Sequence, residues 1–275
     1  MVIDPDTRIF GITGHPLGHS LSPLMHNDAF GFVGINAVYL YFPSQDIKAV
    51  VRGMKALSIR GLSVTIPHKQ TVCACVDELE PIAAKIGAAN TLMNIDGRIT
   101  GYNTDVYGAI SALKEKIKDI RGKRVLLIGA GGAARAIGFA LVDEGADIII
   151  ANRTETRGKS LAKDLNGDFL SLEKLPAGWA NIIIQTTSVG MFPKVDACLV
   201  PGVMLKKGMI VMDVIYNPLE TKLLRLAKEK GCITIGGLEM FIRQGARQFM
   251  IWTGKEPPIK RMRKTVLDFL HKGKG

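Results

Sequence analysis

Short apolar runs alternate with amphipathic stretches along the first hundred residues. Three runs rich in aromatic and branched side chains predict buried strands at residues 8–14, 37–42 and 61–66. Between the runs, apolar positions at helical spacing predict one helix beginning near Pro23 and another over residues 46–57. Strands that alternate with helices favour a largely parallel sheet, which binds ligands beyond the carboxyl ends of its strands.

A second alternating series begins near residue 106. A strand, a glycine turn and a helix occupy residues 124–141, and the next strand and helix follow at residues 146–165. Three more apolar strands continue the series, at residues 181–190, 209–218 and 233–237. The final segment, residues 240–270, predicts two helices. The fold class we expect is therefore α/β with mainly parallel sheets.

Length and composition support two domains. The chain has 275 residues, of which 47% are hydrophobic and 22% charged, enough for a sizeable core. No apolar run approaches the ~20 residues needed to cross a bilayer. The first ten residues carry acids where a signal peptide has basic and then apolar residues. We therefore expect a cytoplasmic protein with no membrane partner.

Charge and cysteine content indicate which metals and partners the protein can bind. The four cysteines (Cys73, Cys75, Cys198 and Cys232) complete no zinc-binding pattern, so we predict no metal and mostly reduced thiols. The formal net charge of +11 raises the alternative of nucleic-acid binding. Basic residues are scattered, however, with one dense run at residues 260–264, and a phosphate-rich cofactor with an acidic substrate accounts for the sign equally well. We predict no nucleic-acid partner; a homodimer is compatible with the sequence, which does not fix the oligomeric state.

The turn after residues 125–128 has the glycine pattern of a dinucleotide-binding site. It follows an apolar strand, opens a helix and fits G-x-G-x-x-A, as Gly129-Ala130-Gly131-Gly132-Ala133-Ala134. Gly129 permits the tight turn, Gly131 lets the main chain approach a pyrophosphate, and Ala134 lets the helix pack closely on the strand. Amides at the helix start then bind the phosphates. The alternative is a glycine turn that only packs well.

The end of the next strand selects the cofactor. An NAD site usually has an acidic residue there, bonded to the ribose 2′-hydroxyl. This strand ends in Asn152-Arg153-Thr154, with no acid before Glu155. A guanidinium binds a 2′-phosphate through charge-assisted hydrogen bonds, whereas a carboxylate repels it. We therefore predict NADP, held by Arg153 with Thr154 and Arg157; the alternative for Arg153 is a solvated loop charge.

Polar side chains in the first domain follow apolar strands. Ser20 and Ser22 can face one anion if their loop bends, although Ser22 could equally cap a helix. Ser63 and Thr65 share one face of a strand that Pro67 ends, so Lys69 is expected to start a helix, against the favourable direction of its dipole. That placement suits an acid/base group.

Two further turns add polar groups to the same domain. Asn90 supplies an amide, and Asp105 supplies a carboxylate that could equally cap the following helix.

Taken in order, eight segments resemble the shikimate dehydrogenase family: SLSP, SVTIPHK, AANT, NTD, GAGGAARA, NRT, DVIYNP and GLEMFIRQ. The segments have the family's order and spacing, and the match runs from about Ile9 to Gln248. The resemblance implies a substrate-binding domain of residues 1–105 plus 238–275 and an NADP-binding Rossmann domain of residues 106–237. It also implies reversible reduction of 3-dehydroshikimate to shikimate in aromatic amino-acid and chorismate biosynthesis.

Carried over residue by residue, the resemblance assigns a role to each motif. Lys69 and Asp105 would form the catalytic pair at the reacting oxygen. The substrate carboxylate would bind Ser20 and Ser22, and its ring hydroxyls would bind Thr65, Asn90 and Gln244, with Tyr216 nearby. The cofactor would contact three groups of residues: Gly129, Ala130, Gly131, Gly132 and Ala133; Asn152, Arg153, Thr154 and Arg157; and Val214, Gly237 and Met240.

One position departs from the family pattern. Ser63 stands where the family most often has Asn, and its shorter side chain puts a direct bond to the substrate in doubt. The change could relax discrimination towards quinate, so a quinate or mixed quinate/shikimate dehydrogenase is the first alternative. A catalytically silent NADP-binding sensor is the second, and the presence of both Lys69 and Asp105 argues against it.

Overall fold

The structure is a computed structural model that describes residues 3–18, 20–174 and 178–272. Two compact units compose it: Met1–Tyr107 with Ile242–Gly275 (unit 1), and Gly108–Phe241 (unit 2). The chain crosses from one unit to the other within helices α4 (Thr104–Lys114) and α8 (Gly237–Thr253). Within the described residues, no helix combines the length and apolar character needed to cross a membrane.

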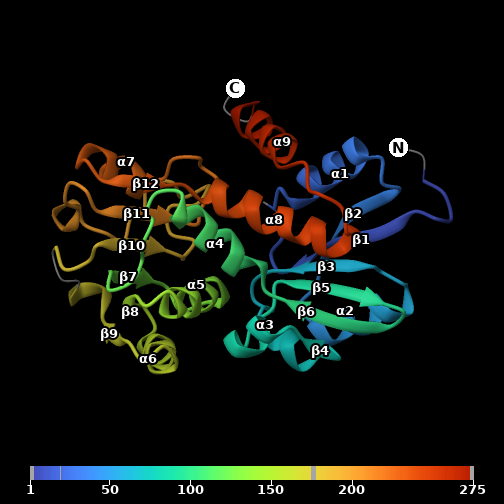
Figure 1. Ribbon diagram of the computed structural model, residues 1–275, viewed down its shortest axis with the longest axis horizontal. Helices are drawn as coiled ribbons and strands as arrows, with labels where there is room; N and C mark the ends of the chain where they lie inside the picture. The colour runs from blue at the N-terminus through green and yellow to red at the C-terminus, as the bar shows by residue number, and fades with distance from the viewer. Residues whose placement is uncertain (1–2, 19, 175–177, 273–275) are drawn as a thin grey trace. The chain divides into compact units, whose positions relative to one another are not determined.

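Unit 1 is built on a six-stranded sheet with the order β2-β1-β3-β5-β6-β4 (Figure 1). Its strands are β1 (Arg8–Gly14), β2 (Ala37–Pro43), β3 (Gly61–Val64), β4 (Glu78–Leu79), β5 (Thr91–Ile95) and β6 (Arg98–Tyr102). Strand β1 pairs in parallel with β2 and β3, as predicted. Strand β5 is antiparallel to both β3 and β6, and the β5–β6 hairpin was not predicted from the sequence.

Helices cover both faces of this sheet. They are α1 (Ser22–Val33), α2 (Ile47–Ala56), α3 (Pro81–Ile86) and a 3-10 turn, η1 (Thr71–Ala74), together with residues 242–253 of α8. Helix α9 (Ile259–Lys272) packs against α1. The helix predicted over residues 46–57 is confirmed, and Asp46 caps it by accepting a hydrogen bond from the amide of Ala49 at 3.0 Å. Val51 and Met54 on its apolar side share one core cluster with Leu62 and Val64 of β3.

An aromatic cluster fills the core between the sheet, α1 and α8. Phe10 lies 5.2 Å from Phe30 and 5.4 Å from Trp252 between ring centroids. Trp252 Nε1 donates to the main-chain oxygen of Leu92 at 2.9 Å, so the indole is both packed and hydrogen-bonded. A Cβ atom on Gly61 would come within 2.4 Å of that indole nitrogen, so the strand accepts only glycine there.

His26 in this core should make stability depend on pH. Its fully buried ring stacks on Tyr39 at 4.7 Å, and burial lowers the pKa of His26 to about 3, against the opposing effect of Gln248. Below pH 6.5 the unfolded chain binds a proton that the folded chain does not, so stability falls as the pH drops from 6.5 towards 3. The slope is about 1.4 kcal/mol per pH unit.

Urea titrations at pH 7 and pH 5 test this expectation. Wild type should lose roughly 2 kcal/mol more than His26→Phe between the two pH values, because only wild type carries the buried imidazole. Equal losses in both proteins would contradict it.

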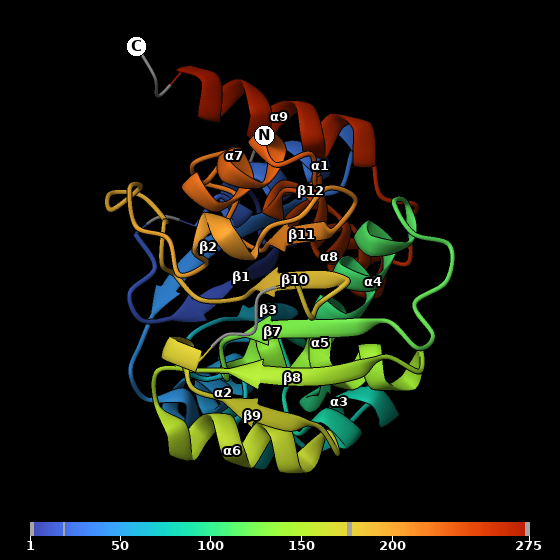
Figure 2. The ribbon, with the colours of Figure 1, turned by 90° about the vertical axis from the view of Figure 1, so that its left-hand side faces the viewer.

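Unit 2 has a six-stranded sheet, all of whose pairings are parallel, with the order β12-β11-β10-β7-β8-β9 (Figure 2). The strands are β7 (Arg124–Ile128), β8 (Asp147–Ala151), β9 (Asp168–Leu170), β10 (Ile182–Gln185), β11 (Ile210–Asp213) and β12 (Ile233–Ile235). Numbered along the chain within this unit, the order is 6-5-4-1-2-3, that of a Rossmann sheet. The predicted α/β class with a Rossmann sheet is confirmed.

Alternate side chains of these strands pack into two separate hydrophobic cores, one on each face of the sheet. From β7, Val125 and Leu127 join a core with α5 (Gly132–Asp143) and α6 (Glu155–Asp164). Leu126 joins the core on the other face, with α7 (Lys222–Glu229). Two short 3-10 turns, η2 (Leu172–Lys174) and η3 (Gly202–Met204), lie in the connections. Burial on both faces explains why these strands are almost wholly apolar.

Candidate active site

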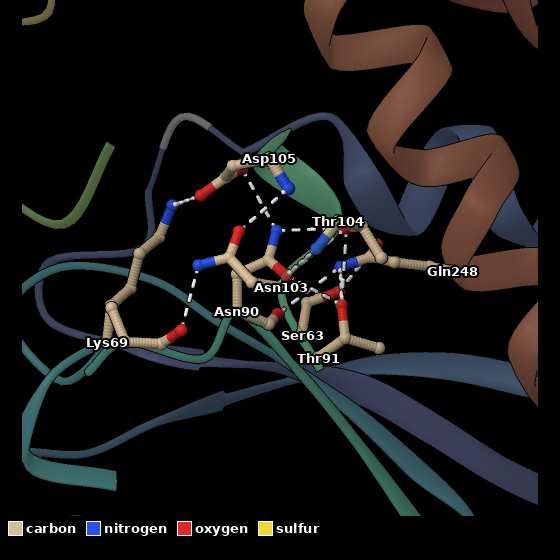
Figure 3. Close-up of polar contacts among 9 residues, drawn as sticks. Ser63, Lys69, Asn90, Thr91, Asn103, Thr104, Asp105 and Gln248 are labelled. Atoms are coloured by element: carbon tan, nitrogen blue, oxygen red, sulfur yellow. Dashed lines mark hydrogen bonds and ion pairs between the residues drawn. The ribbon is translucent and has the colours of Figure 1, made fainter. Parts of the chain in front are cut away.

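Lys69 and Asp105 form an ion pair in unit 1. The Lys69 Nζ atom lies 2.6 Å from Asp105 Oδ2, and the two side chains are only 15% and 6% exposed (Figure 3). Lys69 belongs to the turn after β3, whereas Asp105 belongs to the first turn of α4. Little solvent reaches the pair, so the attraction between ammonium and carboxylate is stronger than at an open surface.

Asn90 and Asn103 hold Asp105 in place. Asn90 Nδ2 donates to Asp105 Oδ1 at 2.9 Å, and the Asp105 amide donates to Asn103 Oδ1 at 3.1 Å. The side chain of Asn103 therefore serves the start of α4. The capping role considered for Asp105 is wrong, which leaves its carboxylate for Lys69.

The expected helix start at Lys69 is also wrong. Residues 66–70 form turns, and only the four-residue η1 follows. The main-chain oxygen of Lys69 accepts from the amide of Ala89 at 2.8 Å. That bond ties the segment to the chain before β5 and keeps it from continuing as a helix. The ion pair with Asp105, and not a helix dipole, therefore orients the Lys69 side chain.

The other polar residues predicted for the substrate also lie in unit 1, except Tyr216. Ser20 Oγ lies 3.2 Å from Ser22 Oγ and accepts from the Ser22 amide at 3.3 Å. Leu21 occupies the N-cap position of α1 and Ser22 is the first residue of the helix, so the capping alternative for Ser22 is wrong. Thr65 is tied to β1 by a bond from its amide to the oxygen of Thr13 at 2.9 Å, and Gln244 lies on α8.

Ser63 is bonded within the core. Its hydroxyl accepts from Tyr39 Oη at 2.6 Å and donates to Gln248 Oε1 at 3.0 Å. Gln248 in turn donates to Thr91 Oγ1 at 2.9 Å. Gln248 was not among the residues predicted for the site, although its position four residues after Gln244 puts the two on one side of a helix.

The glycine turn of unit 2 fits a dinucleotide. Gly129 has φ +118°, donates to the oxygen of Ala151 at 2.8 Å, and would bring a Cβ within 2.3 Å of Thr186 Oγ1. Gly131 precedes α5 without a side-chain cap, and a Cβ there would meet nothing within 4 Å. Open space beside an uncapped helix start is what a pyrophosphate requires.

The end of β8 fits a 2′-phosphate. Arg153 and Arg157 are both exposed, and neither pairs with a carboxylate among the described residues. The nearest acid in sequence, Glu155, bonds Lys159 at 2.8 Å. Asn152 Nδ2 donates to the oxygen of Thr154 at 2.9 Å and so shapes the turn that presents Arg153.

Three residues predicted for the nicotinamide end lie together after β11 and β12. A Cβ on Gly237 would come within 2.3 Å of the oxygen of Val214, so this approach requires glycine. Met240 and Val214 contribute to the same apolar core. Tyr216, in the same loop as Val214, stacks on Phe241 with ring centroids 4.3 Å apart.

A buried carboxylate fixes this loop. Asp213 accepts from the Ile215 amide at 3.0 Å and from Thr221 Oγ1 at 2.7 Å, and Gln185 Nε2 lies 3.3 Å away. Burial raises the pKa of Asp213 to about 6 despite these bonds. Asp213 was not among the residues predicted from the sequence, although it ends an apolar strand. In the part of the chain that the structure describes, no cluster of three or more acidic, His or Cys residues could hold a metal ion.

The sequence of the chain is similar to known proteins along nearly its whole length. Residues 12–92 match the shikimate dehydrogenase substrate binding domain, residues 111–197 the shikimate / quinate 5-dehydrogenase family, and residues 237–267 the shikimate 5'-dehydrogenase C-terminal domain. A shikimate dehydrogenase (NADP+) of Bacillus cereus is 47% identical over 96% of this chain and 99% of its own length. That of Pyrococcus furiosus is 45% identical over 99% and 100%.

Solved structures agree with the sequence relatives. A shikimate dehydrogenase crystallised with NADP+ is 44% identical, with a TM-score of 0.93 over 98% of each chain. The enzyme from Thermus thermophilus, crystallised with NADP(H) and shikimate, is 34% identical, with a TM-score of 0.86 over 95% and 99%. A quinate dehydrogenase of Corynebacterium glutamicum crystallised with NAD is 31% identical, with a TM-score of 0.88 over 95% and 99%. On these similarities, the chain belongs to the shikimate dehydrogenase family.

Proposed function

We propose that this protein catalyses the reversible, NADP-dependent reduction of 3-dehydroshikimate to shikimate. The observation that carries the proposal is the 2.6 Å ion pair between Lys69 and Asp105, in a chain 47% identical to a shikimate dehydrogenase (NADP+). We assign residues 1–105 plus 238–275 to the substrate-binding domain and residues 106–237 to the NADP-binding domain.

Lys69 acts at the reacting oxygen. NADPH, when bound, supplies the hydride that reduces the ketone. The Lys69 ammonium stabilises the negative charge that develops on the ketone oxygen and donates a proton to it. Asp105 keeps that ammonium in position; in the reverse direction, the neutral amine accepts the proton of the alcohol.

The remaining predicted residues bind the two partners. Ser20 and Ser22 take the substrate carboxylate, and Thr65, Asn90 and Gln244 take its ring hydroxyls, with Tyr216 nearby. The cofactor residues comprise the glycine turn and the end of β8 (Gly129 to Ala133, Asn152, Arg153, Thr154 and Arg157), with Val214, Gly237 and Met240 at the nicotinamide. Arg153 binds the 2′-phosphate, because a guanidinium matches phosphate geometry and charge.

The quinate alternative is not favoured. The relatives at 45–47% identity act with NADP and carry the shikimate name, whereas the quinate dehydrogenase is 31% identical. A panel of shikimate and quinate, each with NADP and with NAD, tests this. The value of kcat/KM should be highest for shikimate with NADP, by about ten-fold or more over quinate. NADPH oxidation that 3-dehydroshikimate fails to stimulate would refute the proposed function.

Two further properties belong to the same proposal. A cytoplasmic location fits reduced thiols and the supply of NADPH. A homodimer stays a prediction, which light scattering of the purified protein at several concentrations will test.

A further inference from the structure

We propose that Gln248 is a positioning residue for the Lys69–Asp105 couple and acts through a directed chain of buried hydrogen bonds. The kinetic part of this inference rests on the proposed function; the geometric part rests on unit 1 alone. The chain passes, donor to acceptor, through Tyr39, Ser63, Gln248, Thr91, Asn90 and Asp105. Figure 3 shows its course from Ser63 to Asp105.

The end of the chain at Asp105 fixes the orientation of one amide. The Thr104 amide donates to Asn90 Oδ1 at 2.8 Å, so this atom must be the oxygen. Asn90 Nδ2 is thereby turned to Asp105 Oδ1, at 2.9 Å. Because Asp105 Oδ2 accepts from Lys69, both carboxylate oxygens act as acceptors. The orientation of Asn90 therefore matters to how Asp105 holds Lys69.

Gln248 sets the direction of the bonds that reach Asn90. Its Nε2 donates to Thr91 Oγ1 at 2.9 Å, which leaves the single Thr91 proton for Asn90 Oδ1, also at 2.9 Å. On its other side, Gln248 Oε1 accepts from Ser63, whose hydroxyl already accepts from Tyr39. Burial raises the pKa of the Tyr39 phenol far above its usual range, so Tyr39 remains a donor.

Because these residues are buried, the direction of each bond affects the next residue in the chain. Ser63, Asn90, Thr91 and Gln248 are all buried, so water cannot readily replace a lost partner. An alternative bond does exist, since the hydroxyls of Thr91 and Thr104 lie 3.3 Å apart and either can donate. Without Gln248, the Thr91 proton can turn to Thr104 and release one of the bonds that orient Asn90.

The test compares Gln248→Met with Thr253→Val. The first variant removes the donor and acceptor at the middle of the chain with little change in side-chain length. The second removes one hydroxyl from the same helix, α8, where Thr253 Oγ1 donates to the main-chain oxygen of Phe249 at 2.7 Å, and it leaves every bond from Tyr39 to Asp105. We expect kcat for shikimate oxidation to fall about ten-fold in Gln248→Met and less than about two-fold in Thr253→Val, with KM for NADP unchanged in both.

An NMR measurement of amide proton exchange tests the hydrogen bonds of Asn90 independently of enzyme activity. The side-chain amide protons of Asn90, identified by their loss in Asn90→Ala, should exchange with solvent about ten-fold faster in Gln248→Met than in wild type or Thr253→Val. If wild type showed no dehydrogenase activity, the proposed function would be refuted, but the exchange measurement would still test the geometric part of the inference. If Gln248→Met does not fold, Gln248→Asn serves instead, because its shorter amide cannot span Ser63 and Thr91 together. A Gln248 variant that matches Thr253→Val in either kcat or exchange overturns the inference.

Discussion

Lys69→Ala should lose about 10²- to 10⁴-fold in kcat while the KM for shikimate changes little. In the proposed mechanism, the substitution removes the group that donates a proton to the ketone oxygen and stabilises its developing charge. The same proposal assigns substrate binding to other side chains, so the lost interaction is one that strengthens in the transition state. Steady-state kinetics in both directions, with shikimate binding measured by calorimetry, separate the two effects.

Two further variants serve as comparisons for Lys69→Ala. Lys48→Ala removes an exposed lysine from α2 and should leave kcat unchanged. Asp105→Asn keeps the shape of the partner but removes the charge that holds Lys69, so it should also reduce kcat strongly. Near-normal turnover in Lys69→Ala would exclude Lys69 as the acid/base group, even if Asp105→Asn were inactive.

Strand pattern predicted unit 2 more closely than unit 1. Strands such as β7 and β10 are buried on both faces, so their apolar runs stand out, and each ends at a polar or glycine turn. The β5–β6 hairpin of unit 1 was missed although its signal was present. Asp96 and Gly97, with φ +50° and +86°, form a two-residue turn between alternating residues, a pattern typical of a hairpin.

The site was predictable where its residues belong to local motifs. Lys69 follows the buried strand β3 and Asp105 lies in an NTD motif, but their ion pair joins residues 36 positions apart, and the resemblance supplied it. Gln248 lies 157 residues after Thr91, and no periodicity in the sequence reports such a contact. The expected helix at Lys69 failed for a related reason, since a main-chain bond to Ala89 overrode the local signal. Long-range hydrogen bonds thus decide the details that local patterns miss.

Charge reversal at the end of β8 should change the choice of cofactor. In Arg153→Glu, the KM for NADP should rise roughly 100-fold, because a charge-assisted bond worth about 1.5–3 kcal/mol is lost and a carboxylate faces the phosphate. The KM for NAD should change by less than about three-fold, because NAD has no 2′-phosphate. Arg153 has no carboxylate partner among the described residues, so the variant breaks no ion pair and its fold should be retained.

Lys159→Glu is the matched control for this change. It makes the same alteration of net charge in the neighbouring helix, α6, at a residue already paired with Glu155. If general electrostatic attraction held NADP, both variants would weaken it alike, and raising the salt concentration would remove the difference from wild type. If Arg153 contacts the phosphate directly, only Arg153→Glu separates NADP from NAD. Equal changes in KM for the two cofactors in Arg153→Glu would refute the assignment, and the basis of NADP preference would then lie elsewhere in unit 2.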